Sequence, residues 1–461
     1  MRKLPYFCFV TLVCVSCKVG EDYTAPEIYG DATLARTLHI DKQTPVARKW
    51  YNDFNDSQLT ALIERGLAGS ADIKTATARL KQARAQLQIS KAQLLPQINA
   101  QGGYNYEKTS NNIGPAADSH YYNVGFDASW EIDLWGKNRR QTEAKQATLR
   151  VAEYTLENVR LTVAAEIAAD YINLLQNAEN LRLAEQNARL QQEIFATVKA
   201  KYGSGLSDES AYDEARYLLE NTRAQIPEYR AGVEQYRNAL ATVIGVLPTE
   251  LNIDTTASKQ LSSAAWAKRQ NLFDFPAAML RNRPDVAAAE QKLIAENALV
   301  GAAVAELYPD VSISGLWGYA AQGGSKLIRP SSETYSYAPL ISLPLLDWNR
   351  LQNNVRLQKY IREEALEDYK QTVLSAVAEI RDAQTAYYEA LQSAENRLKA
   401  LENMRSVLKL KQQKYNNGLI EFSDIVTAEQ NLIAAEQAYI ASKAQILLQQ
   451  TAFYKAIGAP L

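Results

Sequence analysis

Hydrophobic residues recur every three or four positions over long stretches of this chain, the spacing of one face of an α-helix. Residues 72–95 show the pattern first, and their apolar side is formed by Ile73, Ala76, Leu80, Ala83 and Leu87. The same spacing predicts further helices over 137–203, 207–244, 285–308, 349–416 and 421–457. At about 1.5 Å per residue, a helix over 137–203 would be ~100 Å long, which is too long for a compact domain.

Between these helices the spacing changes to two, which predicts β-strands. Strands are expected at about 97–108, 120–132, 310–321 and 334–346, as two pairs that each enclose a polar or glycine-rich loop. Strands of about ten residues with one apolar face and aromatic residues near their ends fit the strands of a transmembrane barrel. A soluble hairpin has the same alternation, so both readings stay open on pattern alone.

The chain contains the same sequence pattern twice, with a constant offset of 213 residues. Matching pairs include Asp72 and Asp285, Pro96 and Pro309, Trp135 and Trp348, Glu166 and Glu379, Tyr202 and Tyr415, Gly205 and Gly418, and Gly245 and Gly458. An offset held over this length indicates a duplicated structural unit. We expect a first repeat at 57–245, a linker at 246–271 and a second repeat at 272–458, each with one strand pair and long antiparallel helices.

Four strands are too few to close a barrel, for which about eight is the usual minimum. A membrane also excludes an open sheet edge, so several copies of the chain would have to share one barrel. Two copies would give eight strands and three would give twelve, and strand counting alone leaves both open. The fold class expected is therefore an α+β membrane protein that assembles from several copies.

The N-terminus has the features of an export signal. Residues 1–16 combine a basic start with a short apolar stretch, and Val15-Ser16-Cys17 resembles the bacterial lipobox, although Cys14 stands where that box usually has leucine. We expect Cys17 to carry a covalent lipid and to begin a lipidated segment over 17–56, with plain signal cleavage as the alternative. All three cysteines lie in this region, so the mature body has no disulfide available.

Composition excludes several other classes of function. The formal net charge is -2, so no polyanion-binding surface is expected and nucleic acid is not an expected partner. The two histidines, His39 and His120, lie in no metal-ligand spacing, and Gly102-Gly103 and Gly323-Gly324 precede no helix that could cradle a phosphate. We therefore expect no enzyme, no metal site and no cofactor apart from the lipid on Cys17.

Each long predicted helix ends at a glycine-containing turn and returns as an antiparallel partner. The first turn reads Tyr202-Gly203-Ser204-Gly205-Leu206, and the second reads Tyr415-Asn416-Asn417-Gly418-Leu419. Glycine and asparagine suit the left-handed backbone that closes a helix.

Taken together, these segments resemble the TolC-like outer-membrane efflux family, and in particular its lipoprotein channels, the NodT type, which serve resistance-nodulation-division pumps. The resemblance covers the mature chain and is carried by Cys17-Lys18-Val19-Gly20-Glu21-Asp22-Tyr23 with Pro26, Leu134-Trp135-Gly136-Lys137, Asn282-Arg283-Pro284-Asp285-Val286 and the two turns. It implies a homotrimer that forms a 12-stranded outer-membrane β-barrel and a periplasmic α-helical barrel. It also implies passive export of drugs or other small molecules, with a periplasmic adaptor and an inner-membrane pump as partners.

The same resemblance implies roles for residues at the far ends of the helices. The adaptor would contact the two turns through Tyr202, Gly205, Leu206, Tyr415, Gly418 and Leu419. The channel would be constricted by acidic residues just beyond the second turn, where this chain has Asp424 and, at the position of a second acid, Thr427. Three copies of Asp424 would form a carboxylate ring. Helix stabilisation by an acid in the first turn is the alternative role for Asp424.

Two other functions remain compatible with the sequence. One is a lipid-anchored periplasmic coiled-coil scaffold in which the strand pairs form a small soluble sheet. The other is a TolC-like channel for protein secretion or metal export, although Met279 and Met404 are the only methionines besides the first residue and form no copper track.

Overall fold

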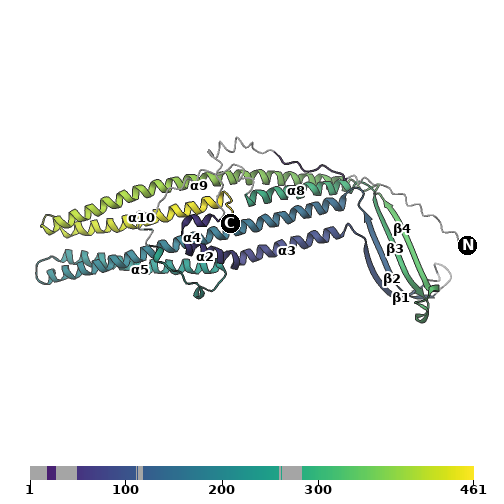
Figure 1. Ribbon diagram of the computed structural model, residues 1–461, viewed down its shortest axis with the longest axis horizontal. Coiled ribbons are helices and arrows are strands. Elements are labelled where there is room, and N and C mark those ends of the chain that lie inside the picture. The colour runs from purple at the N-terminus through teal and green to yellow at the C-terminus, as the bar shows by residue number, and fades with distance from the viewer. Residues whose placement is uncertain (1–17, 27–48, 111, 113–117, 259–260, 262–282) are drawn as a thin grey trace. The chain divides into compact units, whose positions relative to one another are not determined.

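A computed structural model describes residues 18–26, 49–110, 112, 118–258, 261 and 283–461. The described chain is mostly helical and contains one four-stranded antiparallel sheet (Figure 1). It divides into two compact units. The sheet unit comprises residues 1–26, 79–153 and 288–370, and the hairpin unit comprises residues 27–78, 154–287 and 371–461. Each unit therefore draws segments from both sequence repeats.

The sheet contains the strands in the order β1-β2-β3-β4. The strands are β1 Gln97–Lys108, β2 Asp118–Ile132, β3 Asp310–Ala321 and β4 Glu333–Ser342. The bounds of β1 and β3 are those predicted, whereas β4 ends at Ser342 and the expected end at 346 is wrong. Ser342 pairs with Asp310, the first residue of β3, so the residues that follow Ser342 have no β3 residue beside them.

The two faces of the sheet differ in polarity. One face carries exposed apolar and aromatic side chains from all four strands: Ile98, Tyr104, Tyr106, Tyr122, Val124, Phe126, Trp130, Ile313, Trp317, Tyr335, Tyr337 and Ile341. The other face is mainly polar, with Tyr121 and Leu340 as exposed exceptions. On it Asn99 donates to Asp127 at 3.0 Å and Asn105 donates to Asn123 at 3.0 Å. The sheet can therefore separate an apolar medium from an aqueous one.

The shorter helices begin near their predicted positions but end earlier. Helix α3 spans Ala71–Ala92 and α8 spans Pro284–Ala305, so the expected ends at 95 and 308 are wrong. In both repeats a tight turn replaces the last three residues: Leu95 N–H donates to Ala92 C=O, and Tyr308 N–H donates to Ala305 C=O. A proline follows each turn and disfavours helix at the residue before it.

Four long helices form two antiparallel hairpins (Figure 1). Helices α4 Lys137–Gly203 and α9 Arg350–Asn416 each contain 67 residues, and they return as α5 Glu209–Ile244 and α10 Phe422–Ala456. Helix α5 begins two residues later than expected because Asp208, in extended backbone, is its N-cap. Among the described residues, no helix combines the length and the apolarity that a membrane span requires.

The sequence pattern did not predict two elements at the start of the hairpin unit. A 3₁₀ turn, η1, spans Trp50–Phe54, and helix α2 spans Ser57–Gly69 with Asp56 as its N-cap. Trp50 is fully buried and stacks on Tyr454 with 5.4 Å between ring centroids. These elements supply a large part of the core of this unit.

A buried arginine ties together three segments of the hairpin unit. Arg283 donates two hydrogen bonds to Asp285, at 2.9 and 2.6 Å, and one to Glu379 at 2.7 Å. It also donates to the Ala456 carbonyl near the end of α10 at 2.6 Å. This is the Arg-Pro-Asp sequence on which part of the family resemblance rests. Its role in the structure is to join the start of α8 to α9 and α10.

A second buried arginine holds the N-terminal segment against the sheet unit. Arg140, at the start of α4, donates to the carbonyls of Val19 at 3.2 Å and Gly20 at 2.8 Å and pairs with Asp22 at 3.0 Å. Val19 in turn donates its N–H to the Trp135 carbonyl at 3.1 Å. Cys17 and the predicted signal lie outside the described residues, but Lys18, the residue after Cys17, pairs with Glu143 on α4 at 2.6 Å.

Candidate functional site

The two turns at the ends of the long helices have the same backbone geometry. In the first, Gly205 N–H donates to Tyr202 C=O at 3.0 Å, and Leu206 N–H donates to Lys201 C=O at 2.8 Å. In the second, Gly418 donates to Tyr415 and Leu419 donates to Lys414, both at 2.9 Å. This is the Schellman pattern, in which a left-handed residue satisfies the last helical carbonyls. Gly205 and Gly418 have φ values of +72° and +71°, which glycine adopts without strain.

Both turns present a leucine to solvent. Leu206 is 79% exposed and Leu419 is 70% exposed, whereas the apolar residue at this position of a Schellman turn frequently packs back on its own helix. Tyr202 is 41% exposed and stacks on Tyr212. Two exposed leucines on rigid turns are a suitable surface for contact with another protein.

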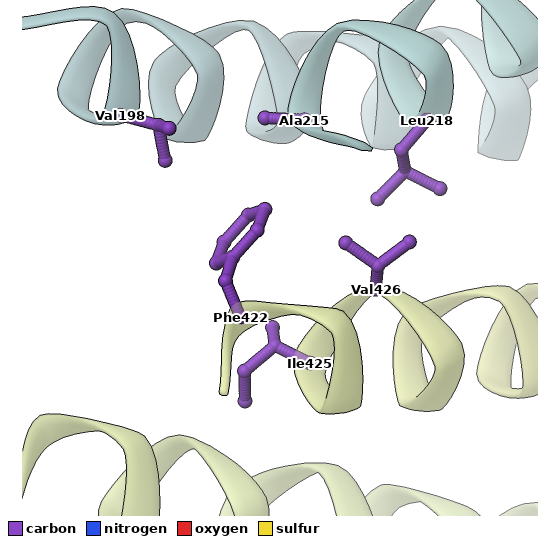
Figure 2. Close-up of a cluster of buried hydrophobic side chains, with 6 residues drawn as sticks. All are labelled: Val198, Ala215, Leu218, Phe422, Ile425 and Val426. Carbon is purple, nitrogen blue, oxygen red and sulfur yellow. The ribbon is translucent and has the colours of Figure 1, made fainter. Parts of the chain in front are cut away.

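The ends of the two hairpins pack against each other within the hairpin unit. Figure 2 shows the apolar side chains that join them, which are Val198, Ala215 and Leu218 from the first hairpin and Phe422, Ile425 and Val426 from the second. Tyr415 packs beside this cluster, and the Lys201 ammonium lies 5.7 Å from the centre of its ring. The structure therefore brings the predicted residues of both turns to one end of this unit.

Asp424 lies in the first turn of α10 and is paired within its own hairpin. Lys411 Nζ on α9 contacts Asp424 Oδ1 at 2.9 Å and the Asp424 carbonyl at 3.3 Å. The two side chains are 31% and 44% exposed, so water screens the pair in part. The carboxylate predicted for the constriction thus has a cationic partner on the neighbouring helix.

Thr427 lies one turn farther along α10 and is exposed. Its hydroxyl donates to the Ser423 carbonyl at 2.9 Å, so it bonds to its own helix. Two residues beyond it, burial raises the pKa of the Glu429 carboxyl and disfavours its charged form.

The two hairpins differ at the N-terminus of the returning helix. Asp208 caps α5 by accepting from Ala211 N–H at 2.8 Å, whereas the matching residue, Glu421, makes no side-chain cap bond on α10. The first turn of α10 therefore lacks a stabilising contact that the first turn of α5 has.

Sequence reasoning missed Lys411 and the Phe422 cluster. Lys411 and Asp424 are 13 residues apart on the two helices of one hairpin. Pairing the two helices residue by residue outward from the Gly418 turn would have placed them side by side. No group of three or more potential metal ligands occurs in the described part of the chain.

Comparison with known proteins adds independent information. The sequence profile of the family described as "Outer membrane efflux protein" matches residues 62–246 and 276–459, which are the two repeats. "Cation efflux system protein CusC" of Escherichia coli (strain K12) is 25% identical over 462 residues, covering 99% of each chain. "Toluene efflux pump outer membrane protein TtgI" of Pseudomonas putida is 25% identical over 473 residues, covering 99% of this chain and 98% of that one.

Solved structures show the same fold. The outer-membrane channel OprN is 28% identical with a TM-score of 0.87, over 96% of this chain and 99% of that chain. The Campylobacter jejuni CmeC outer membrane channel is 26% identical with a TM-score of 0.84, over 96% of this chain and 95% of that chain. The chain therefore belongs to the outer membrane efflux protein family.

Proposed function

We propose that this chain is the outer-membrane channel of a tripartite efflux pump and that it conducts small molecules passively from the periplasm to the exterior. The observation that carries the proposal is the sheet, which has one apolar face, one polar face and two free edges. Such a sheet fits a share of a barrel wall, with the apolar face toward lipid and the polar face toward a water-filled lumen. The family match and the two channel structures support this assignment.

Three copies would form the barrel and, below it, a periplasmic duct built of helical hairpins. Each copy contributes four strands, so three copies give the twelve strands that the family resemblance implies. A lipid on Cys17 would anchor each copy in the outer membrane. The N-terminal segment that Arg140 holds lies directly after this residue.

The two turns are the proposed contact for a periplasmic adaptor, which would connect the channel to an inner-membrane pump. Leu206 and Leu419 supply the apolar contact, while Gly205 and Gly418 shape the turns. Burying a leucine side chain contributes about 1.5–3 kcal/mol. Each leucine is therefore worth roughly a tenfold or greater change in affinity.

The proposed activity is transport alone, without a chemical step at this chain. Relatives at 25% identity bear names that refer to cations in one case and to toluene in the other. The name of the cation relative is the observation that favours the second candidate, metal export. In the proposed arrangement the energised pump selects the cargo, and this channel gives it a route.

Reconstitution tests the proposal directly. Purified protein is expected to run as a heat-resistant trimer in detergent and to produce discrete conductance steps in a planar bilayer. A monomer that produces no conductance in the bilayer would contradict the channel assignment and favour the coiled-coil scaffold.

The double variant Leu206→Ser, Leu419→Ser tests the adaptor contact. It is expected to assemble trimers as the parent does but to restore drug resistance poorly in cells that lack the chromosomal copy, because the adaptor contact loses both apolar anchors. Leu190→Ser is the matched control, since Leu190 is 52% exposed on α4 away from the turn. Full resistance in the double variant would remove the turns from the contact.

Asp424→Ala tests the constriction. Asp424→Ala should raise conductance without lowering trimer yield, because it removes the three carboxylates that would ring the proposed constriction. Lys411→Ala should do the same, most strongly at low salt, because it leaves three unpaired carboxylates. Thr427→Ala should have a smaller effect because that side chain is uncharged.

Lys399→Ala serves as the control for these recordings, since Lys399 pairs with Glu395 within one helix at 3.0 Å. Conductance that stays at the parent level in both Asp424→Ala and Lys411→Ala would exclude this pair from the constriction.

A further inference from the structure

The two strand hairpins have identical registers once the 213-residue offset is applied. Gln97 pairs with Ser129 in the first hairpin, and Asp310 pairs with Ser342 in the second, so both partners move by 213 positions. The duplication therefore extends to individual strand pairs.

A third strand pair joins the two repeats within one chain. Strand β2 of the first repeat pairs with β3 of the second, and the register places Val124 opposite Tyr319 and Ala128 opposite Gly315. By the 213-residue offset, β4 is the counterpart of β2 and β1 is the counterpart of β3. Within one copy, β1 and β4 are separated by β2 and β3 and cannot pair.

We infer that β4 of one copy pairs with β1 of the next copy in the register of the β2–β3 pair, so that Tyr337 lies opposite Tyr106 and Ile341 opposite Gly102 of that copy. These positions follow from Val124–Tyr319 and Ala128–Gly315 by the 213-residue offset. This inference rests on the proposed assembly and specifies the contact that closes it.

The faces of the two edge strands agree with this register. Tyr337 and Ile341 belong to the apolar face of β4, and Tyr106 belongs to the apolar face of β1. A slip of one residue would place the apolar side chains of one strand on the polar face of the other. The inferred register keeps both faces continuous across the junction.

The inferred β4–β1 pair also explains why β4 ends early in a single copy. In β2, Trp130 and Ile132 lie beyond Ser129, the last β2 residue that β1 pairs with, and they remain in the strand because β3 pairs with them. Their counterparts, Leu343 and Leu345, are 46% and 88% exposed and follow the end of β4. The inferred register gives Leu343 a partner in Ala100 of the next copy and extends β4.

A pair of tryptophans marks the same junction. Trp135 donates its indole N–H to the Pro309 carbonyl at 2.9 Å and stacks on Tyr308 with 4.7 Å between ring centroids. Its counterpart, Trp348, is 84% exposed and has a left-handed backbone, with φ of 55°. By the same exchange of repeats, Trp348 should lie on Leu95 and Pro96 of the next copy.

The receiving turn for Trp348 already has the required shape. Leu94 and Leu95 donate to Lys91 and Ala92 at 3.2 and 3.1 Å, and their counterparts make the same two bonds at 3.1 Å each before Pro309. Leu95 is 64% exposed. Both halves of the contact are therefore exposed on one copy, and the receiving turn has the same hydrogen bonds as the turn that already holds Trp135.

Cysteine pairs on the polar face test the register. Ser336→Cys with Glu107→Cys, and Leu340→Cys with Gly103→Cys, are in register, because their counterparts Asn123 with Ala320 and Asp127 with Leu316 are paired. The swapped combinations, Ser336→Cys with Gly103→Cys and Leu340→Cys with Glu107→Cys, are the matched controls. They are four residues out of register, which adds ~13 Å at about 3.3 Å per residue and exceeds the reach of a disulfide.

Mild oxidation of membranes should give covalent dimers and trimers with the two registered pairs and only monomers with the two swapped pairs. Cross-linking of the swapped pairs, or of none of the four in a protein that still assembles as trimers, would overturn the register and leave the proposed function intact. Absence of trimers in the parent would instead contradict the proposed function.

Trp348→Ala provides a second readout. It should lower the temperature at which the trimer dissociates in detergent while leaving the helical circular dichroism of the protein unchanged. Trp348→Phe should restore part of this temperature by returning the ring without the indole N–H. An unchanged dissociation temperature in Trp348→Ala would contradict the tryptophan contact.

Discussion

The backbone hydrogen-bonding groups along the free edges of β1 and β4 are the constraint on which the rest of this structure depends. In a membrane each unpaired N–H or C=O group costs several kcal/mol, so a four-stranded sheet cannot stay open there. A single copy has no means to close it, because β2 and β3 stand between its edges. Assembly is therefore a condition for placing this sheet in a bilayer, and the other parts of each copy have to follow the symmetry that the closed barrel sets.

Because of the internal repeat, only a few kinds of contact are needed to build that assembly. The same strand contact would occur as the β2–β3 pair within a chain and as the inferred β4–β1 pair between chains. In the same way, the contact that Trp135 makes within a chain would be repeated by Trp348 between chains. The repeats diverge at the turns between the long helices and their returning partners. Asp208 caps α5 while Glu421 does not cap α10, and Asp424 pairs with Lys411 where the first hairpin has Ala211. Opening and closing of the duct would involve this divergent end, because identical hairpins would have no reason to move differently.

Sequence periodicity predicted the long helices and the strands because those features repeat over many residues. It missed α2, which is a short helix of 13 residues that contains two glycines. In the structure a Cβ at Gly69 would lie 2.5 Å from the backbone oxygen of Ile244, so packing requires glycine at this position. The turn residues of the candidate site were predicted from the glycine pattern and the family resemblance together. The partner of Asp424 was not, because a pair across a hairpin depends on the rotation of two helices, which local patterns do not contain. The end of β4 was wrong for a related reason, since its strand partner is inferred to lie in another copy.

Amide hydrogen exchange along the four strands tests the central claim most directly. In assembled protein in lipid nanodiscs, β1 and β4 should exchange as slowly as β2 and β3, because all four strands have partners on both sides. The contradicting result is exchange within minutes at the amides of β1 and β4 that point away from β2 and β3, while β2 and β3 stay protected. That result would show that the two edges are open.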